Sequence, residues 1–158
     1  MLQPADVARS SRLLADSHSA IRPADNDVTS PASPALEHFI RSTLGCKCPD
    51  EVFQSVAIDR ADSHIRLVIG NRLLIYVLET APGRTAAKAV SRMTEQGVAD
   101  RNAEHLNRFR LVVASTQPTL ILADTKASFA GAAGDDDHAH LHVLATDQLP
   151  AELGRSSA

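Results

Sequence analysis

The fold is decided by the stretch Ile65-Arg-Leu-Val-Ile-Gly-Asn-Arg-Leu-Leu-Ile-Tyr-Val-Leu78. It holds two strand-like runs of aliphatic residues, and Gly70-Asn71-Arg72 between them is a tight-turn signal. A third run of the same kind, Gln54 to Arg60, comes just before. These three runs predict consecutive strands that pair as a meander or hairpin.

Helical patterns flank these strands. Ser33 has the character of an N-cap with Pro34 at the first helical position, and the first helix is expected to end at Gly45. Its apolar stripe is Leu36, Phe39, Ile40 and Leu44. After Gly45, Pro49-Asp50-Glu51 predicts a short helical turn. A second helix is expected to begin near Pro82 and to stop at Gly97, followed by a shorter helical piece from Val98 to His105.

The rest of the chain is expected to add strands. Phe109 to Ala114, Thr119 to Ala123 and Leu141 to Ala145 have strand character, with a loop over residues 125–137 and a helical turn after Asp147. The resulting order is α-β-β-β-α-β followed by C-terminal strands. We therefore predict a single α+β domain with two main helices and a mixed or antiparallel sheet.

Length and composition set limits on the class of protein. The chain has 158 residues, of which 44% are hydrophobic, and this suits one buried core. The Ser-, Asp- and Pro-rich composition of residues 1–33 predicts a disordered extension, residues 34–150 the domain and residues 151–158 a flexible tail. A net charge of −3 and few aromatic residues make nucleic acid an unlikely partner. No run of eighteen apolar residues and no secretory signal occur, so we expect a cytoplasmic protein without a membrane partner.

The most pointed chemical feature is the turn Gly45-Cys46-Lys47-Cys48-Pro49. A positively charged lysine and a helix that begins at the proline would stabilise a thiolate, above all at Cys48. Cys48 is then the thiol of lower pKa, and Cys46 is its resolving partner. A disulfide across one intervening residue would be easily reduced, so we expect a catalytic or sensory bond if it forms.

The same two sulfurs provide half of a site for zinc, copper or an iron–sulfur cluster. The missing ligands would come from His38, from a distant histidine or from a second copy of the chain in a metal-bridged homodimer. Three histidines alternate at His138, His140 and His142, so a strand would project all three from one face. The alternative is that Leu141, Val143 and Ala145 face the core while the histidines face solvent.

Two further patterns suggest other ligands. The element order matches the core of restriction-endonuclease-like nucleases, in which Asp59 and Glu79 would meet at neighbouring strand ends, although the lysine of that motif is missing after Glu79. Arg108 and Arg110 alternate on a strand, and together with Arg72 and Arg101 they suggest a surface for an anionic ligand or a partner. Alternating arginines are more often the solvent face of a strand.

The segment Phe39-Ile-Arg-Ser-Thr-Leu-Gly-Cys-Lys-Cys-Pro-Asp-Glu-Val-Phe53 resembles a group of small uncharacterised prokaryotic proteins. Two later blocks, Gly70-Asn-Arg-Leu-Leu-Ile-Tyr and Asn107-Arg-Phe-Arg-Leu-Val, carry the same resemblance, which covers about residues 36–115. It supports the choice of the core domain and implies no activity.

The leading hypothesis is that Cys46 and Cys48 act together, either as a dithiol and disulfide pair or as ligands of a soft metal. The competing hypothesis is a non-catalytic module that binds another protein through a sheet edge or through the face of Arg108 and Arg110.

Overall fold

The computed structural model describes residues 29–80 and 84–154. Its N-terminal half contains α2 (Pro34–His38), the π-helical turn η2 (Phe39–Thr43), the 3-10 helix η3 (Asp50–Gln54), β1 (Val56–Arg60), β2 (Ile65–Ile69) and β3 (Leu73–Glu79). Its C-terminal half contains α3 (Arg84–Ala103), β4 (Arg108–Ser115), α4 (Pro118–Ala133), β5 (Ala139–Ala145) and the 3-10 helices η4 (Thr146–Gln148) and η5 (Ala151–Leu153).

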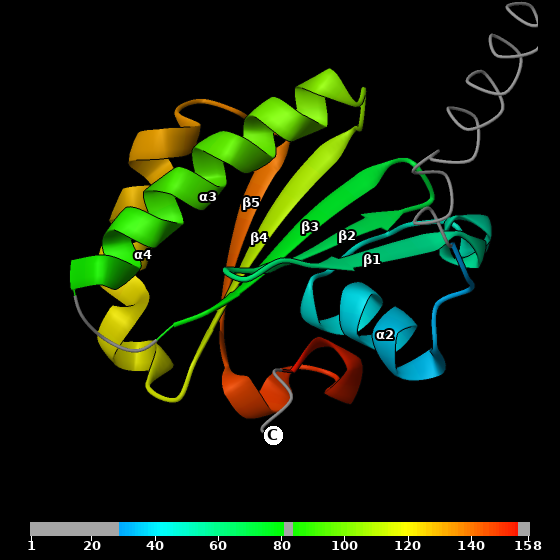
Figure 1. Ribbon diagram of the computed structural model, residues 1–158, viewed down its shortest axis with the longest axis horizontal. Coiled ribbons are helices and arrows are strands. Elements are labelled where there is room, and N and C mark those ends of the chain that lie inside the picture. Colours follow the sequence, from blue (N-terminus) through cyan, green and yellow to red (C-terminus); the bar gives the residue numbers. More distant parts are fainter. Residues whose placement is uncertain (1–28, 81–83, 155–158) are drawn as a thin grey trace, which may run out of the picture.

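The five strands form one mixed sheet whose strand order is the same as the chain order (Figure 1). β1, β2 and β3 pair antiparallel, as the tight turn at Gly70 to Arg72 predicted. β3, β4 and β5 pair parallel. Before each new strand, α3 or α4 carries the chain back to the end of the sheet at which the preceding strand began. The predicted fold class, a single α+β domain with two main helices against the sheet, is confirmed.

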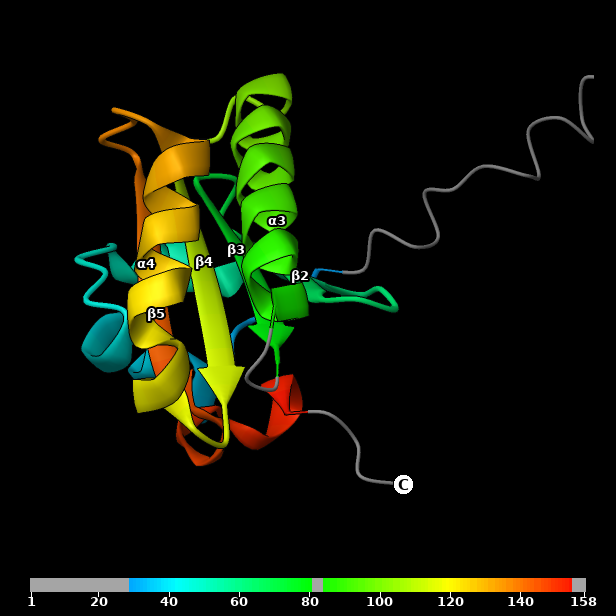
Figure 2. The same cartoon turned by 90° about the vertical axis from the view of Figure 1, so that its left-hand side faces the viewer.

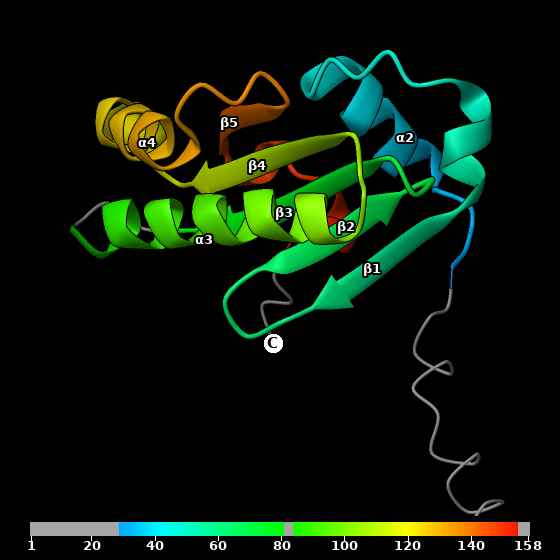
Figure 3. The same ribbon diagram turned by 90° about the horizontal axis from the view of Figure 1, so that it is seen from above.

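Helices cover both faces of the sheet. α3 and α4 lie side by side on one face (Figure 2), whereas α2 lies on the opposite face (Figure 3). Along β3, Ile75 and Val77 face the α2 side, and Leu74 and Tyr76 face the α3 side. Every residue from Leu73 to Leu78 is buried because the strand is covered twice.

The first helical segment confirms the predicted cap and stripe. The Ser33 hydroxyl oxygen accepts a hydrogen bond from the Leu36 N–H at 3.1 Å, with Pro34 in the first turn. All four residues of the apolar stripe are buried. The segment ends in wider turns, in which the Leu44 N–H donates to the Phe39 carbonyl and the Cys46 N–H donates to the Ile40 carbonyl.

The predicted stop at Gly97 is wrong, because α3 continues without a break to Ala103. The glycine serves packing: a Cβ atom built on it would lie 2.7 Å from Phe109 Cε2 and closer still to two other ring carbons. Phe109 is fully buried on β4. Gly97 therefore lets α3 lie directly on an aromatic ring of the sheet.

The predicted strand at Thr119 to Ala123 and the predicted loop at residues 125–137 are also wrong. Both fall largely within α4, which begins at Pro118 in a first-turn position and ends at Ala133. Ile121 and Thr125, one turn apart, are the buried residues of this helix. A short apolar run reads alike in a strand and in a helix, so its pattern did not separate the two. β5 is thus the one strand that follows β4 in the described residues.

Packed residues extend past both predicted limits of the domain. Ser30 and Val56 exchange two backbone hydrogen bonds, and Leu153 is fully buried in the core on the α2 side. The Ser33 hydroxyl donates to the Glu152 carboxylate, which ties the two ends of the fold together. The predicted disordered extension lies outside the described residues over positions 1–28, as does the end of the predicted tail over positions 155–158. Within the described ranges, no helix combines the length and the apolar character needed to cross a membrane.

Candidate functional site

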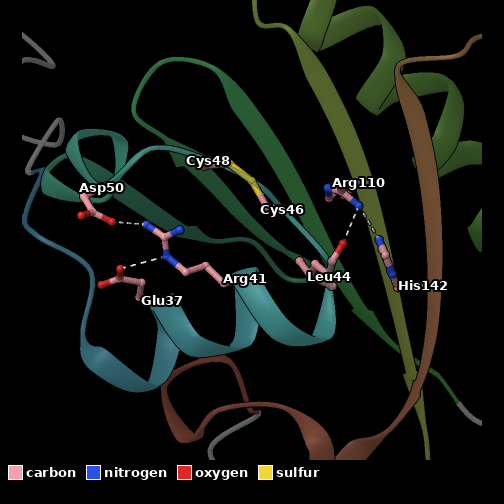
Figure 4. The surroundings of a disulfide bond; sticks show 8 residues. All are labelled: Glu37, Arg41, Leu44, Cys46, Cys48, Asp50, Arg110 and His142. Carbon is pink, nitrogen blue, oxygen red and sulfur yellow. Dashed lines mark hydrogen bonds and ion pairs between the residues drawn. A yellow bond between two sulfur atoms is a disulfide. The ribbon is translucent and has the colours of Figure 1, made fainter.

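The cysteine turn follows the first helical segment directly. Gly45 leaves the helical conformation with a φ of 68°, and its neighbour Cys46 is held by the hydrogen bond to Ile40. The structure joins Cys46 and Cys48 in a disulfide, with their Cα atoms 5.4 Å apart (Figure 4). Cys46 is buried, whereas Cys48 is partly exposed and packs at the margin of the core. Cys48 is thus the more exposed of the two cysteines.

The predicted helix start after Pro49 is present, but η3 has only five residues. Its first turn also carries Asp50 and Glu51, and negative charges there compete with a thiolate for the free N–H groups. Asp50 forms an ion pair with Arg41, which in turn binds Glu37 (Figure 4). The expected order of the two thiol pKa values therefore stays a prediction.

The cysteine turn forms one wall of a cavity of about 410 Å³. The facing wall is built by Arg72, Arg108, Arg110 and His140. Lys47 lines the cavity as well, and no acidic residue is among the described residues that line it. We call this hollow the basic cavity.

Strand pairing brings the basic residues together. Arg72 stands in the turn before β3, and its carbonyl oxygen accepts hydrogen bonds from the backbone N–H groups of Asn107 and Arg108. β4 continues with Arg110 on the same face, and β5 places His140 opposite Arg110. The cavity therefore depends on parallel pairing between strands that are distant in sequence, which no local pattern indicates.

Arg110 occupies an unusual position for an arginine, because only 9% of its surface is exposed. Its Nη1 donates to the Leu44 carbonyl oxygen at 2.8 Å and contacts His142 Nε2 at 2.8 Å (Figure 4). Its Nε is buried and has no hydrogen-bond partner in the described part of the chain. Burial and the nearby charge of Arg108 lower the pKa of Arg110. The expectation that Arg110 faces solvent is wrong.

The geometry fixes the protonation of the two strand histidines. An arginine carries only donors, so His142 Nε2 must accept the bond from Arg110, and the ring is neutral with its proton on Nδ1. His140 Nε2 stands in the same relation to Arg108, at 3.3 Å from Nη1. Burial, followed by Arg110 and His140, lowers the pKa of His142 to about 4. Burial and the two arginines also lower the pKa of His140.

The predicted metal ligands are not brought together. Among the described residues, no group of three or more histidine, cysteine or acidic side chains is placed to hold a metal ion. His38 lies near the Ser42 hydroxyl, and His138 precedes β5 with its backbone N–H bound to Asp136. His140 and His142 do share one face, as alternation predicts, but their Nε2 atoms face arginines. As the alternative predicted, Leu141 and Val143 pack on the other face, against the core below α3 and α4.

The predicted pair of nuclease carboxylates does not form either. Asp59 is in register with Arg66 and Tyr76, and Tyr76 faces the α3 side of the sheet. Glu79 follows Val77 by two positions on β3 and so belongs to the α2 side. The two carboxylates project from opposite faces of the sheet and cannot share a metal ion.

A second hollow, of about 580 Å³, is larger, but its lining residues do not indicate one kind of chemistry. It is lined by Arg60, His64 and Glu79 among others, so charges of both signs meet there, and it contains no cysteine. Arg101, which was grouped with the basic residues, lies elsewhere and pairs with Asp136. The basic cavity is therefore the candidate site.

Fold and site together define an α+β domain with a paired-cysteine turn at the wall of a basic cavity. No protein-family model matches the sequence, and comparison with curated proteins and with solved structures finds no similar chain. Function must be inferred from the site itself.

Proposed function

We propose that this protein is a thiol–disulfide redox protein in which Cys46 and Cys48 interchange between the dithiol and the disulfide. The observation that carries this role is the position of both sulfurs, bonded to one another and lining an open cavity. Cys46 packs in the core and Cys48 at its margin, and both residues also border this space. The lack of a third ligand among the described residues favours sulfur exchange over a soft-metal centre.

The unequal exposure of the cysteines supports distinct roles. The thiolate of Cys48, the more exposed cysteine, attacks one sulfur of a substrate disulfide, and the other substrate sulfur leaves as a thiolate. Cys46 then attacks the Cys48 sulfur, and the second substrate thiolate leaves. The protein dithiol has become a disulfide, and the substrate disulfide has become two thiols, so electrons and protons balance.

Thiol counting across a series of redox buffers tests this function. In the wild-type chain both thiols should disappear together and return together as the buffer is made more reducing. The variant Cys46→Ser should trap a mixed disulfide on Cys48, because the resolving thiol is gone. Ser42→Ala, an exposed change on the preceding turn, serves as the matched control and should behave as wild type. Thiols that stay inert in every buffer would rule out redox exchange.

Elemental analysis of the same anaerobic preparation addresses the soft-metal alternative. Zinc, copper or iron that copurifies with wild type and is lost from the double variant Cys46→Ser, Cys48→Ser would replace the redox proposal. A metal shared between two chains would also require sedimentation as a dimer.

A non-catalytic interaction module is the second candidate, and one observation favours it. Of the three large apolar side chains that are exposed among the described residues, Leu120 and Leu122 lie on α4, at 66% and 38% exposure, and a group of exposed apolar side chains marks an interaction surface. Binding of a partner there would survive the double cysteine variant and would be lost in Leu120→Ser. Loss of partner binding in the cysteine variant would count against this second role.

A further inference from the structure

We propose that the basic cavity binds an oxyanion group, a carboxylate or a phosphate, carried by a small molecule. This concerns the ligand of the cavity, and it holds whether or not the cysteines exchange electrons. The contacts of the arginines, the burial of Arg110 without a counter-charge and the local charge each support it.

Among the described residues, the three arginines of the cavity have no acidic partner, in contrast to several other arginines of the fold. Arg41, Arg66 and Arg101 each form an ion pair with a carboxylate. Within residues 29–80 and 84–154, no ion pair includes any of the three arginines that line the cavity, Arg72, Arg108 and Arg110. Guanidinium groups match carboxylate and phosphate geometry, so three of them around one hollow provide the donors that an oxyanion requires.

Arg110 supplies the second observation. A buried guanidinium is costly unless its donors are paired, and here Nη1 makes both contacts while Nε has none. The groups nearest to it are a carbonyl and a neutral imidazole, neither of which offsets its charge. An oxyanion seated against this guanidinium would supply the counter-charge that its protein neighbours do not provide.

Local charge and shape favour a small molecule over nucleic acid. The whole chain has a net charge of −3, so attraction to a polyanion would have to come from this one place. The basic residues line a concave space of about 410 Å³, a volume within the usual range for small-ligand sites.

The position of the sulfurs narrows the ligand further, and this step rests on the redox function proposed above. Cys46 and Cys48 line the same cavity as the arginines, so a bound oxyanion would hold the rest of its molecule beside the reactive sulfurs. The substrate class is then a small disulfide that carries a carboxylate or phosphate. The arginines position it, and exchange follows the two balanced steps already given.

Binding is tested on the oxidised full chain by NMR titration with malonate, with inorganic phosphate and with malonamide as the uncharged control. We expect saturable shifts of the His140 and His142 ring signals with an anion and none with malonamide. The pKa of His142 should rise, because the anion offsets the charge of Arg110. A response to malonate alone assigns the site to carboxylates, and one to phosphate alone assigns it to phosphoryl groups.

Three results would overturn the anion site. They are the absence of saturable shifts with either anion, equal binding of malonamide, and binding of a single-stranded oligonucleotide that neither anion displaces.

Charge-removing variants locate the site. Arg110→Met and Arg108→Gln should each weaken anion binding about tenfold or more, as expected for loss of a charge-assisted hydrogen bond. Arg108 is exposed, so its variant retains the fold even if Arg110→Met does not. Arg92→Gln removes the same charge from an exposed position on α3 and should bind as wild type. Equal weakening in Arg92→Gln would show a general charge effect and no site.

Thiol kinetics separate this inference from the redox function. The reduced chain is mixed with anionic dithiobis-nitrobenzoate or with neutral dithiodipyridine. Arg108→Gln should slow the anionic reagent about tenfold and leave the neutral one unchanged. Inert thiols together with binding of malonate or phosphate would remove the redox function and keep the anion site. Cycling thiols without binding of either malonate or phosphate would do the reverse.

Discussion

Replacing Gly97 by alanine should destabilise the protein, although alanine is the better helix former. In an exposed helix the change would gain about 1 kcal/mol. Here the new Cβ would lie 2.7 Å from Phe109 Cε2, whereas carbon atoms rest at about 3.5 to 4.0 Å. Two other ring carbons would lie closer still, so either the ring or α3 must move by more than about 1 Å.

The expected cost follows from how little the ring can yield. Phe109 is fully buried and contacts Tyr76 edge-to-face, with their ring centroids 5.3 Å apart. Overpacking of such a core costs about 1 to 3 kcal/mol, and this site belongs near the top of that range. After the gain in helix propensity, Gly97→Ala should lower the free energy of unfolding by about 2 kcal/mol.

Urea unfolding followed by circular dichroism measures this difference, and Gly131→Ala is the matched control. Gly131 is also a helical glycine, but its Cβ would meet nothing within 4 Å, so that variant should gain about 0.5 to 1 kcal/mol. Adding Phe109→Leu should relieve part of the Gly97→Ala cost in a double-mutant cycle. If Gly97→Ala is as stable as wild type, the close packing of α3 on the Phe109 ring is wrong.

Three further changes test other parts of the fold. Folding lowers the pKa of His142 from 6.5 to about 4. Between these two pH values the unfolded chain binds more protons than the folded chain, so the protein loses stability as the pH falls through this range. The full pKa shift corresponds to about 3 kcal/mol, and solvent screening of this half-buried ring reduces the expected loss of stability to about 1 to 2 kcal/mol. When unfolding is measured at several pH values, the stability of His142→Asn should fall less with decreasing pH than that of wild type. Ser33→Ala removes the cap of α2 and should cost about 1 kcal/mol in urea unfolding, and an unchanged midpoint would contradict the capping role. Gly70→Ala combines a φ of 57° with a Cβ only 2.7 Å from Val52 Cα, so we expect a loss of at least about 2 kcal/mol, and thermal unfolding within a degree of wild type would refute it.

Local signals in the sequence were enough for much of the fold. Ser33, Pro34 and the apolar stripe defined the first helix, and Gly70 to Arg72 defined the turn of the antiparallel strands. The errors arose where a local signal has two physical meanings. Gly97 resembles a helix stop, but a glycine is needed there because the Phe109 ring of β4 packs against it. Thr119 to Ala123 has the apolar character of a strand, and only its packing against the sheet shows a helix.

Only part of the candidate site could be predicted from the sequence. The cysteine turn was evident from its spacing, and the basic residues near Asn107 were evident from their charge. Their meeting depends on the parallel register that sets Leu73 beside Arg108. The burial of Arg110 had one signal: it shares its strand face with Val112 and Ala114, which are core residues. An arginine in line with core positions therefore indicates a buried charge.

The order of the strands bears on how the chain folds during synthesis. Because each strand pairs with the one made just before it, the sheet grows at one edge as the polypeptide emerges. Local pairing keeps loop-closure costs low and favours rapid formation of the β1–β2–β3 meander. Until β4 arrives, however, the apolar strand β3 presents an unpaired edge, which is a template for association between chains. A ribosome that pauses after β3 has emerged and before β4 has would hold the nascent protein with this edge open.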